Sequence, residues 1–128
     1  QERARQLLRP EVTQTVLSWM ESVVEQGSGI GVLTPGYRIG GKTGTAQKVV
    51  NGIYQQGVKI CSFVANLPVE KPQFVVLVVV DEPKGEHAYG STVAVPVAKE
   101  IIDGLLVLQK IPPSDNNLRL QPAMKPGI

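Results

Sequence analysis

The feature that most constrains the fold is a short, unbroken run of apolar residues, Phe74 to Val80, in which valine predominates. β-Branched residues favour strands, and the run is too short for a typical helix. It is also far shorter than the roughly 20 residues that a helix needs to cross a bilayer, and no signal peptide is visible. Because strands that are covered on both faces are continuously apolar, the run predicts a central strand.

The signals for helices lie near the two ends of the chain. Apolar residues recur at helical spacing after Arg9-Pro10, and Gly27-Ser28-Gly29 ends that pattern. A second helical pattern begins near Ala94, where Pro96 fits only in the first turn. We therefore predict two helices, with Trp19 in the core. The apolar residues are Val12, Val16, Trp19, Met20 and Val23 in the first pattern, and Ala94, Val97, Ala98, Ile101, Leu105 and Leu108 in the second.

The segment between these helices is rich in strand and turn signals. We predict a strand near residues 37–48, a tight hairpin turn at Asn51-Gly52, a strand over residues 58–66 and a loop over residues 81–90. The order of helix, hairpin, strand and helix predicts an α+β fold, in which an antiparallel sheet is backed by an N-terminal and a C-terminal helix. Nothing in the sequence covers the other face of this sheet, so we expect another part of the domain to cover it.

The two ends of the chain set its expected boundaries. Residues 1–110 carry the pattern of a folded domain, whereas residues 111–128 contain four prolines and little apolar patterning, which predicts a flexible tail. The chain starts with Gln1 and not with Met, so we expect a processed product or a piece of a longer protein. The absence of a membrane anchor here therefore carries no information on the parent protein.

The composition excludes several classes of function. The chain is 42% hydrophobic and 19% charged with a net charge of +2, which is typical of a globular domain and gives no basic stripe for nucleic acid. Cys61 is the only cysteine, so it forms neither an internal disulfide nor a cysteine metal site, and we expect it in the core. His87 has no partner for a metal or catalytic site, so we expect an exposed loop residue and no bound metal.

One motif suggests nucleotide binding. Residues 36–43 match the P-loop pattern, and Asp81-Glu82 after the apolar run could hold magnesium. A P-loop needs a helix that starts at the Lys-Thr pair, whereas here Gly44 and the hairpin signal follow Lys42-Thr43. A nucleotide-binding protein remains an alternative. Asp81 and Glu82 could also form a catalytic pair, but adjacent strand residues point to opposite faces, so we expect them only to end a strand.

The same residues also fit a strand that recognises a carboxylate. On a strand, Thr43 and Thr45 lie on one face with their hydroxyls about 7 Å apart, and Lys42 adds a cation nearby. Gly44 has no side chain, so a substrate backbone can approach and pair with the strand. An ordinary surface hairpin with a lysine and two threonines explains these four residues equally well.

The wider sequence context favours the carboxylate-binding strand. From Val12 to Pro113 the chain resembles the C-terminal half of the transpeptidase domain of class B high-molecular-weight penicillin-binding proteins, which share their fold with serine β-lactamases. The resemblance lies in these blocks, in this order: Gly40-Gly41-Lys42-Thr43-Gly44-Thr45-Ala46-Gln47, Ser62-Phe63-Val64-Ala65-Asn66-Leu67-Pro68, Val78-Val79-Val80-Asp81-Glu82-Pro83, Tyr89-Gly90, and Ala94-Val95-Pro96-Val97-Ala98-Lys99-Glu100-Ile101.

The resemblance implies a peptidoglycan D,D-transpeptidase that cross-links stem peptides by serine acyl transfer and binds β-lactams. Lys42 and Thr45 are then catalytic residues: Lys42 supplies positive potential and supports proton transfer, and the backbone N–H of Thr45 is one half of an oxyanion hole. Lys42, Thr43, Gly44 and Thr45 together bind substrate, with the threonine hydroxyls on the terminal carboxylate. The resemblance implies no metal and no soluble cofactor.

The other motifs of the family are not in place. No Ser-x-x-Lys occurs in the chain, so the nucleophile is expected on an N-terminal part of the same domain, and the chain alone is expected to be inactive. Ser114-Asp115-Asn116 spells the family's middle motif but follows Lys-Thr-Gly, so we treat it as coincidence. The parent is expected in the cytoplasmic membrane of a bacterium with the domain on its extracytoplasmic side. A noncatalytic β-lactam sensor on this fold remains a second alternative.

Overall fold

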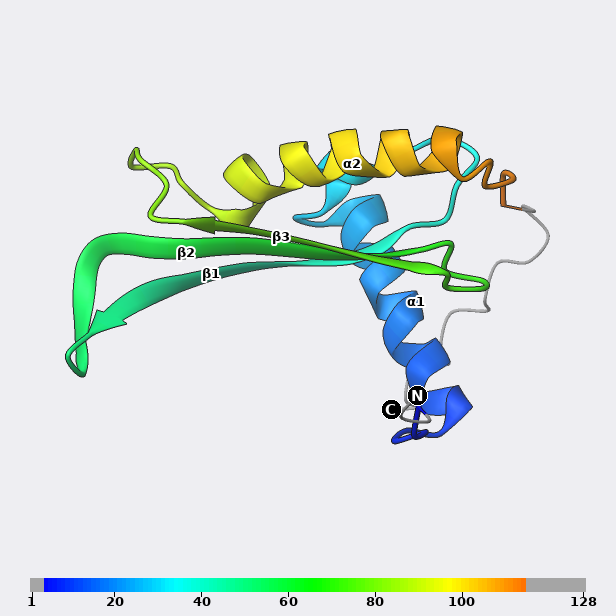
Figure 1. Ribbon diagram of the computed structural model, residues 1–128, viewed down its shortest axis with the longest axis horizontal. Helices are drawn as coiled ribbons and strands as arrows, with labels where there is room; N and C mark the ends of the chain where they lie inside the picture. Colours follow the sequence, from blue (N-terminus) through cyan, green and yellow to red (C-terminus); the bar gives the residue numbers. More distant parts are fainter. Residues whose placement is uncertain (1–3, 115–128) are drawn as a thin grey trace, which may run out of the picture.

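Three antiparallel strands in the order β1-β2-β3 lie at the centre of the structure, a computed structural model that describes residues 4–114 (Figure 1). The strands are β1 (Gly40–Val50), β2 (Ile53–Leu67) and β3 (Phe74–Asp81). All three predicted strands are present, and both neighbouring pairs are antiparallel. The predicted α+β class and the antiparallel sheet are therefore confirmed.

The hairpin between β1 and β2 turns at Asn51-Gly52, as predicted. Both residues adopt positive φ angles, 52° and 78°, which a tight two-residue hairpin turn requires and which asparagine and glycine tolerate best. β2 pairs with β3 only from Ile60 onward, so the turn end of the hairpin is a two-stranded arm that extends past β3 (Figure 1). β2 is longer than the sequence pattern suggested, whereas β1 begins three residues and ends two residues later than predicted.

Two α-helices flank the sheet, α1 (Pro10–Gln26) and α2 (Val95–Leu108), each with a proline in its first turn. α1 ends where the glycines predict, because the backbone N–H groups of Gly27 and Gly29 both donate to the carbonyl of Val23, at 3.0 and 3.1 Å. Two short elements were not predicted: a 3₁₀ turn, η1 (Ile30–Val32), and a π-helical turn, η2 (Gly90–Ala94), that leads into α2.

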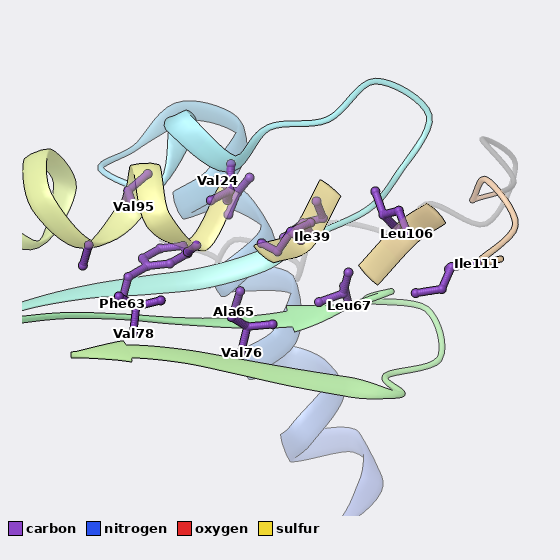
Figure 2. Packing of buried hydrophobic residues seen from close by; sticks show 14 residues of the cluster. Val24, Ile39, Phe63, Ala65, Leu67, Val76, Val78, Val95, Leu106 and Ile111 are labelled. Carbon is purple, nitrogen blue, oxygen red and sulfur yellow. The ribbon is translucent and has the colours of Figure 1, made fainter. Parts of the chain in front are cut away.

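The core lies between α2, the end of α1 and one face of the sheet (Figure 2). The side chain of Phe63 on β2 is fully buried at its centre. Gly41 on the neighbouring strand leaves the space that this ring occupies, since a Cβ atom there would lie 2.4 Å from Cζ of Phe63. The other buried members include Val24, Ile39, Ala65, Leu67, Val76, Val78, Val95, Ala98, Ile102, Leu106 and Ile111.

Residues 74–80 were predicted to form a central strand that is covered on both faces, and within residues 4–114 this prediction is wrong. β3 lies at the edge of the sheet, and its outward residues Val75, Leu77 and Val79 are 68%, 63% and 55% exposed. α2 lies on the opposite side of the sheet (Figure 1). The apolar run therefore has one face in the core and one face that nothing in residues 4–114 covers, which agrees with the expected shortage of cover.

The prediction for Trp19 is also wrong, because its side chain is 60% exposed. α1 packs mainly on β1, and it buries Val24 while Met20 lies over Gly40, where a Cβ atom would be 3.2 Å from Cβ of Met20. The stripe of α1 that faces the sheet is therefore rotated away from Trp19. Neither α-helix in residues 4–114 has the length and apolar character needed to cross a membrane.

The predicted boundary at residue 110 falls inside packed chain. Ile111 is buried, and its carbonyl accepts a hydrogen bond from the Tyr37 hydroxyl at 3.1 Å. Ser114 is buried as well, and its backbone N–H donates to the carbonyl of Gly36 at 2.8 Å. Prolines at 112 and 113 do not prevent docking, because the polar groups beside them find backbone partners. The rest of the predicted tail lies outside the described residues.

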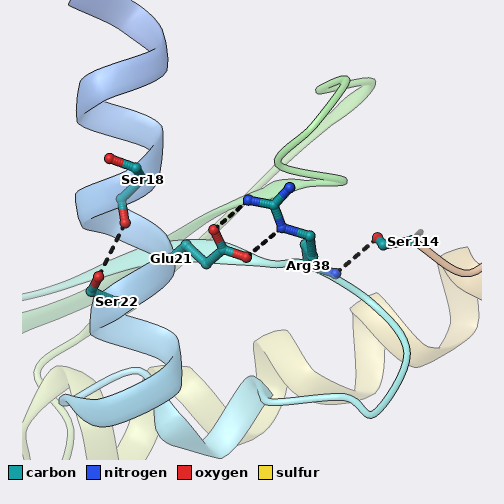
Figure 3. A network of polar contacts seen from close by, with 5 residues as sticks. All are labelled: Ser18, Glu21, Ser22, Arg38 and Ser114. Atoms are coloured by element: carbon teal, nitrogen blue, oxygen red, sulfur yellow. Dashed lines mark hydrogen bonds and ion pairs between the residues drawn. The ribbon is translucent and has the colours of Figure 1, made fainter. Parts of the chain in front are cut away.

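A network of polar contacts joins the first helix to this C-terminal segment (Figure 3). The Arg38 guanidinium donates two hydrogen bonds to the Glu21 carboxylate, both at 2.7 Å, and the Arg38 backbone N–H donates to Oγ of Ser114 at 3.0 Å. The hydrogen bond to Glu21 raises the pKa of Arg38 above its ordinary value despite partial burial. Arg38 therefore stays charged and holds α1 against the segment that leads into β1.

Candidate functional site

Residues 42–45 lie within β1, at an edge of the sheet, and pair with β2 on their inner side. No helix starts at Lys42-Thr43, because the whole of Gly40–Val50 is a strand. This segment therefore has no helix N-terminus, whose backbone N–H groups hold the phosphates in a P-loop. The alternative of a nucleotide-binding protein is not supported. The outer side of β1 pairs with no other strand among the described residues.

Thr43 and Thr45 lie on the same face of β1, as the alternation of strand residues predicts. Their partners across the β1–β2 ladder, Phe63 and Cys61, are both fully buried, so this face is the one that carries the core. Oγ1 of Thr43 lies 2.8 Å from Oγ of Ser28, in the turn after α1. Oγ1 of Thr45 accepts a hydrogen bond from the backbone N–H of Gly90 at 3.0 Å.

The side chain of Lys42 leaves β1 on the opposite face, but its ammonium group still contacts the backbone of the strand. Nζ of Lys42 donates to the carbonyl oxygen of Thr43 at 2.8 Å, and the side chain is exposed. No carboxylate among residues 4–114 forms a salt bridge with Lys42, so its positive charge is not neutralised there. The structure therefore brings two hydroxyls and one uncompensated cation to the same short stretch of strand.

The missing side chain of Gly90 allows the closest contact at this site. A Cβ atom on Gly90 would lie 2.6 Å from the carbonyl oxygen of Ser62 and 2.7 Å from that of Gly44. Turn η2 can therefore rest directly on the backbone of β1 and β2, which brings the Gly90 N–H to Thr45. Gly44 faces the opposite side, where a Cβ atom would lie 2.5 Å from Oγ of Ser62.

Asp81 is the last residue of β3, as predicted, but the expectation that the carboxylates of Asp81 and Glu82 point apart is wrong. Both bind Nζ of Lys48, at 3.1 and 2.7 Å. Glu82 lies just beyond β3 and has a φ of 52°, so it no longer follows strand alternation. The hydrogen bonds that the Lys48 ammonium donates to Glu82, and to a smaller extent to Asp81, raise the pKa of Lys48. The two carboxylates therefore bind Lys48, and this contact links the end of β3 to β1.

The remaining candidates lie outside this stretch. His87 is exposed in the loop before η2, and Cys61 is buried with its thiol donating to the carbonyl of Ala88 at 3.6 Å. Within the described part of the chain no three His, Cys, Asp or Glu side chains are grouped to hold a metal ion. Sequence reasoning missed Ser28 and Gly90. Ser28 was interpreted only as part of a helix stop, and Gly90 only as the end of a loop and as part of the resemblance.

Comparisons with known proteins agree on one family. Residues 1–103 match the penicillin binding protein transpeptidase domain family. The chain is 45% identical over 106 residues to a peptidoglycan D,D-transpeptidase FtsI homolog of Mesostigma viride, and this match covers 82% of the chain and 18% of that protein. It is 40% identical over 114 residues to the stage V sporulation protein D of Bacillus subtilis, covering 89% of the chain and 18% of that protein.

Solved structures give the same result. The transpeptidase domain of penicillin-binding protein 3 from Burkholderia pseudomallei superposes with a TM-score of 0.76 at 36% identity, and the match covers 88% of this chain and 34% of that one. For penicillin-binding protein 3 from Mycobacterium tuberculosis in complex with ampicillin the TM-score is 0.73 at 27% identity, with 91% and 29% covered. The chain thus spans about a fifth of the length of the curated relatives. These matches show that the chain belongs to the penicillin-binding protein transpeptidase domain family, as a fragment of the transpeptidase domain of a class B member.

Proposed function

We propose that this chain is the part of a peptidoglycan D,D-transpeptidase that grips the donor stem peptide, through Lys42, Thr43, Gly44 and Thr45. The observation that carries the proposal is the pair of hydroxyls on one face of an edge strand, next to the unneutralised ammonium of Lys42. A peptide C-terminus is an anion that accepts hydrogen bonds, so two hydroxyls and a cation suit it. The outer edge of β1, which pairs with no other strand in residues 4–114, suits an extended peptide that adds to the sheet.

The reaction that this proposal implies is acyl transfer through a serine. The serine hydroxyl attacks the carbonyl of the terminal D-Ala-D-Ala bond, the last D-alanine leaves, and the amine of a second stem peptide takes the acyl group. The backbone N–H of Thr45 would donate to the developing oxyanion, and one such donor contributes about 2.7 to 4 kcal/mol in acyl transfer. Lys42 would add positive potential and support proton transfer. No metal or soluble cofactor enters these steps.

The nucleophile in this proposal belongs to a part of the transpeptidase domain that the chain does not span. The serines of the chain are Ser18, Ser22, Ser28, Ser62, Ser91 and Ser114, and none has a lysine three residues later. A serine hydroxyl without an adjacent base is a weak nucleophile at neutral pH. Incubation of this chain alone with excess penicillin should therefore give no covalent adduct by intact-mass spectrometry, and a stoichiometric adduct would refute the assignment.

The binding role of the strand is tested in the intact transpeptidase domain. Thr45→Val keeps the shape of the side chain but removes the hydroxyl, and a hydrogen bond to a charged group contributes about 1.5 to 3 kcal/mol. Acylation by penicillin should therefore slow by about tenfold to a hundredfold. Thr13→Val is the matched control, because Thr13 is an exposed threonine of α1 whose hydroxyl donates only to the carbonyl of Pro10. Unchanged kinetics in Thr45→Val would remove Thr45 from the site.

The alternative of a noncatalytic β-lactam sensor makes a different prediction. A sensor acylates with penicillin but does not join two stem peptides, so a cross-linking assay with peptidoglycan precursors separates the two. We further propose that the parent is anchored in the cytoplasmic membrane of a bacterium, with this domain on the extracytoplasmic side, where the peptidoglycan substrate is located. Its partners are then stem peptides, β-lactams and the rest of the same domain.

A further inference from the structure

We propose that Ser28 is a positioning residue that turns the Thr43 hydroxyl into a hydrogen-bond donor for a substrate carboxylate, and that the Gly90 N–H does the same for Thr45. This inference rests on the proposed function, since it concerns the same two threonines. It adds two groups that lie far from them in sequence, in the turn after α1 and in the turn before α2. With both hydroxyls as donors, the site would favour ligands that carry a free carboxylate.

The argument starts from the single proton of a hydroxyl group. A threonine hydroxyl can donate one hydrogen bond and accept through two lone pairs. A backbone N–H can only donate, so in its 3.0 Å contact with Gly90 the Oγ1 of Thr45 is the acceptor. The proton of Thr45 is therefore not used in this contact. It remains free to be donated to a ligand.

The contact between Thr43 and Ser28 can run in either direction, because both partners are hydroxyls 2.8 Å apart. If Thr43 donated to Ser28, only its lone pairs would face a bound carboxylate, and two acceptors repel each other. A carboxylate can only accept. When it binds, Ser28 must therefore donate to Thr43, and Thr43 then donates to the ligand. Ser28 is the only side chain that the structure places in hydrogen-bond contact with the Thr43 hydroxyl among residues 4–114.

The turn that carries Ser28 is held tightly, so its hydroxyl is already in place. The N–H groups of Gly27 and Gly29, on either side of Ser28, both donate to the carbonyl of Val23. Gly29 is buried, and a Cβ atom there would lie 3.2 Å from Val24 and 3.3 Å from Phe63. Donors that are fixed before the ligand arrives need little reorganisation, which strengthens their effect on a charged group. Turn η2 holds Gly90 equally closely against β1.

The decisive experiment compares two probes in the intact transpeptidase domain: penicillin, and the methyl ester of the same penicillin, which lacks the negative charge. With Ser28→Ala the second-order rate of acylation by penicillin should fall by about threefold to tenfold, the effect of one neutral hydrogen bond. The slower acylation by the methyl ester should stay unchanged. Ser28→Thr keeps a hydroxyl and should restore the rate with penicillin. Ser22→Ala is the control, because Ser22 is exposed on α1 and its hydroxyl bonds only to the carbonyl of Ser18.

A double-mutant cycle adds a second readout. If Ser28 acts through Thr43, then Ser28→Ala should have no further effect in a Thr43→Val background. The inference is overturned if Ser28→Ala slows both probes equally, which would indicate a structural role, or if it slows neither. Failure of the proposed function looks different: Thr43→Val and Thr45→Val would then leave acylation by penicillin unchanged, whatever Ser28→Ala does.

Discussion

Gly90→Ala should destabilise the domain by steric overlap, without any change of backbone preference. Gly90 does not adopt a positive φ, so alanine fits its backbone conformation. The new Cβ would lie 2.6 Å from one carbonyl oxygen and 2.7 Å from another, and both belong to strands that are hydrogen-bonded to each other. An ordinary contact needs about 3.4 Å, so η2 must move out by roughly 0.8 Å or the β1–β2 ladder must open.

The magnitude follows from these two effects. Overpacking of this kind costs about 1 to 3 kcal/mol. A shift of roughly 0.8 Å would also stretch the 3.0 Å hydrogen bond from Gly90 to Thr45 beyond the normal range, which removes about 0.5 to 1.5 kcal/mol. We therefore expect a loss of about 2 to 4 kcal/mol in the free energy of unfolding. Acylation by penicillin should slow as well, because the Thr45 hydroxyl loses its partner.

Gly104→Ala is the matched control for this variant. Gly104 lies inside α2, and a Cβ atom there would meet nothing within 4 Å. Alanine is the better helix former, so this variant should be more stable by up to about 1 kcal/mol. Urea unfolding followed by far-ultraviolet circular dichroism measures both. If Gly90→Ala were as stable as the wild type, or matched Gly104→Ala, the close packing of η2 on β1 and β2 would be wrong.

Two further predictions concern stability. Glu21→Gln breaks a mostly buried ion pair with Arg38 and should cost about 3 kcal/mol, whereas Glu11→Gln, in an exposed pair with Arg9, should cost less than about 1 kcal/mol in the same urea experiment. Because the pKa of Arg38 is raised, the stability that its ion pair contributes is lost only as the pH rises through this raised pKa. The cost of Glu21→Gln should therefore not change between about pH 7 and pH 10, and a steep change in this window would contradict the assignment. Val78→Thr places a hydroxyl in the core and should cost about 1 to 3 kcal/mol, but Val79→Thr on the exposed face of β3 should change the stability by less than about 0.5 kcal/mol; equal effects would mean that the two faces are not distinct.

The elements of the fold could be predicted wherever a local rule applies. Asn51-Gly52 predicts a hairpin turn because its backbone needs two positive φ angles, and Pro96 limits the start of α2 to its own first turn. The cover of each face could not be predicted in the same way. A continuously apolar strand indicates two apolar faces, but it does not tell which segments lie on them, so β3 was placed at the centre of the sheet. The rotation of α1 about its axis, which exposes Trp19, likewise depends on tertiary packing.

The candidate site divides in the same way. The two-residue period of a strand predicts that Thr43 and Thr45 share a face, and the structure confirms it. The partners of these threonines could not be found by any local rule. Ser28 meets Thr43 from 15 residues away, and Gly90 meets Thr45 from 45 residues away, so both contacts depend on how the two helices dock. Their signal in the sequence is only a pair of glycine-rich turns.

The contacts of residues 36–38 have a consequence for how the domain folds. The Arg38 side chain in this short segment binds Glu21 of α1. The backbone N–H of Arg38 and the backbone carbonyl of Gly36 bind Ser114, and Arg38 and Ser114 are 76 residues apart in the sequence. Closing so long a loop has an entropic penalty that is recovered only once the contacts inside it have formed. We expect the C-terminal segment to dock late in folding and to make the transition more cooperative. Removal of residues 111–128 should therefore speed unfolding more than it slows folding.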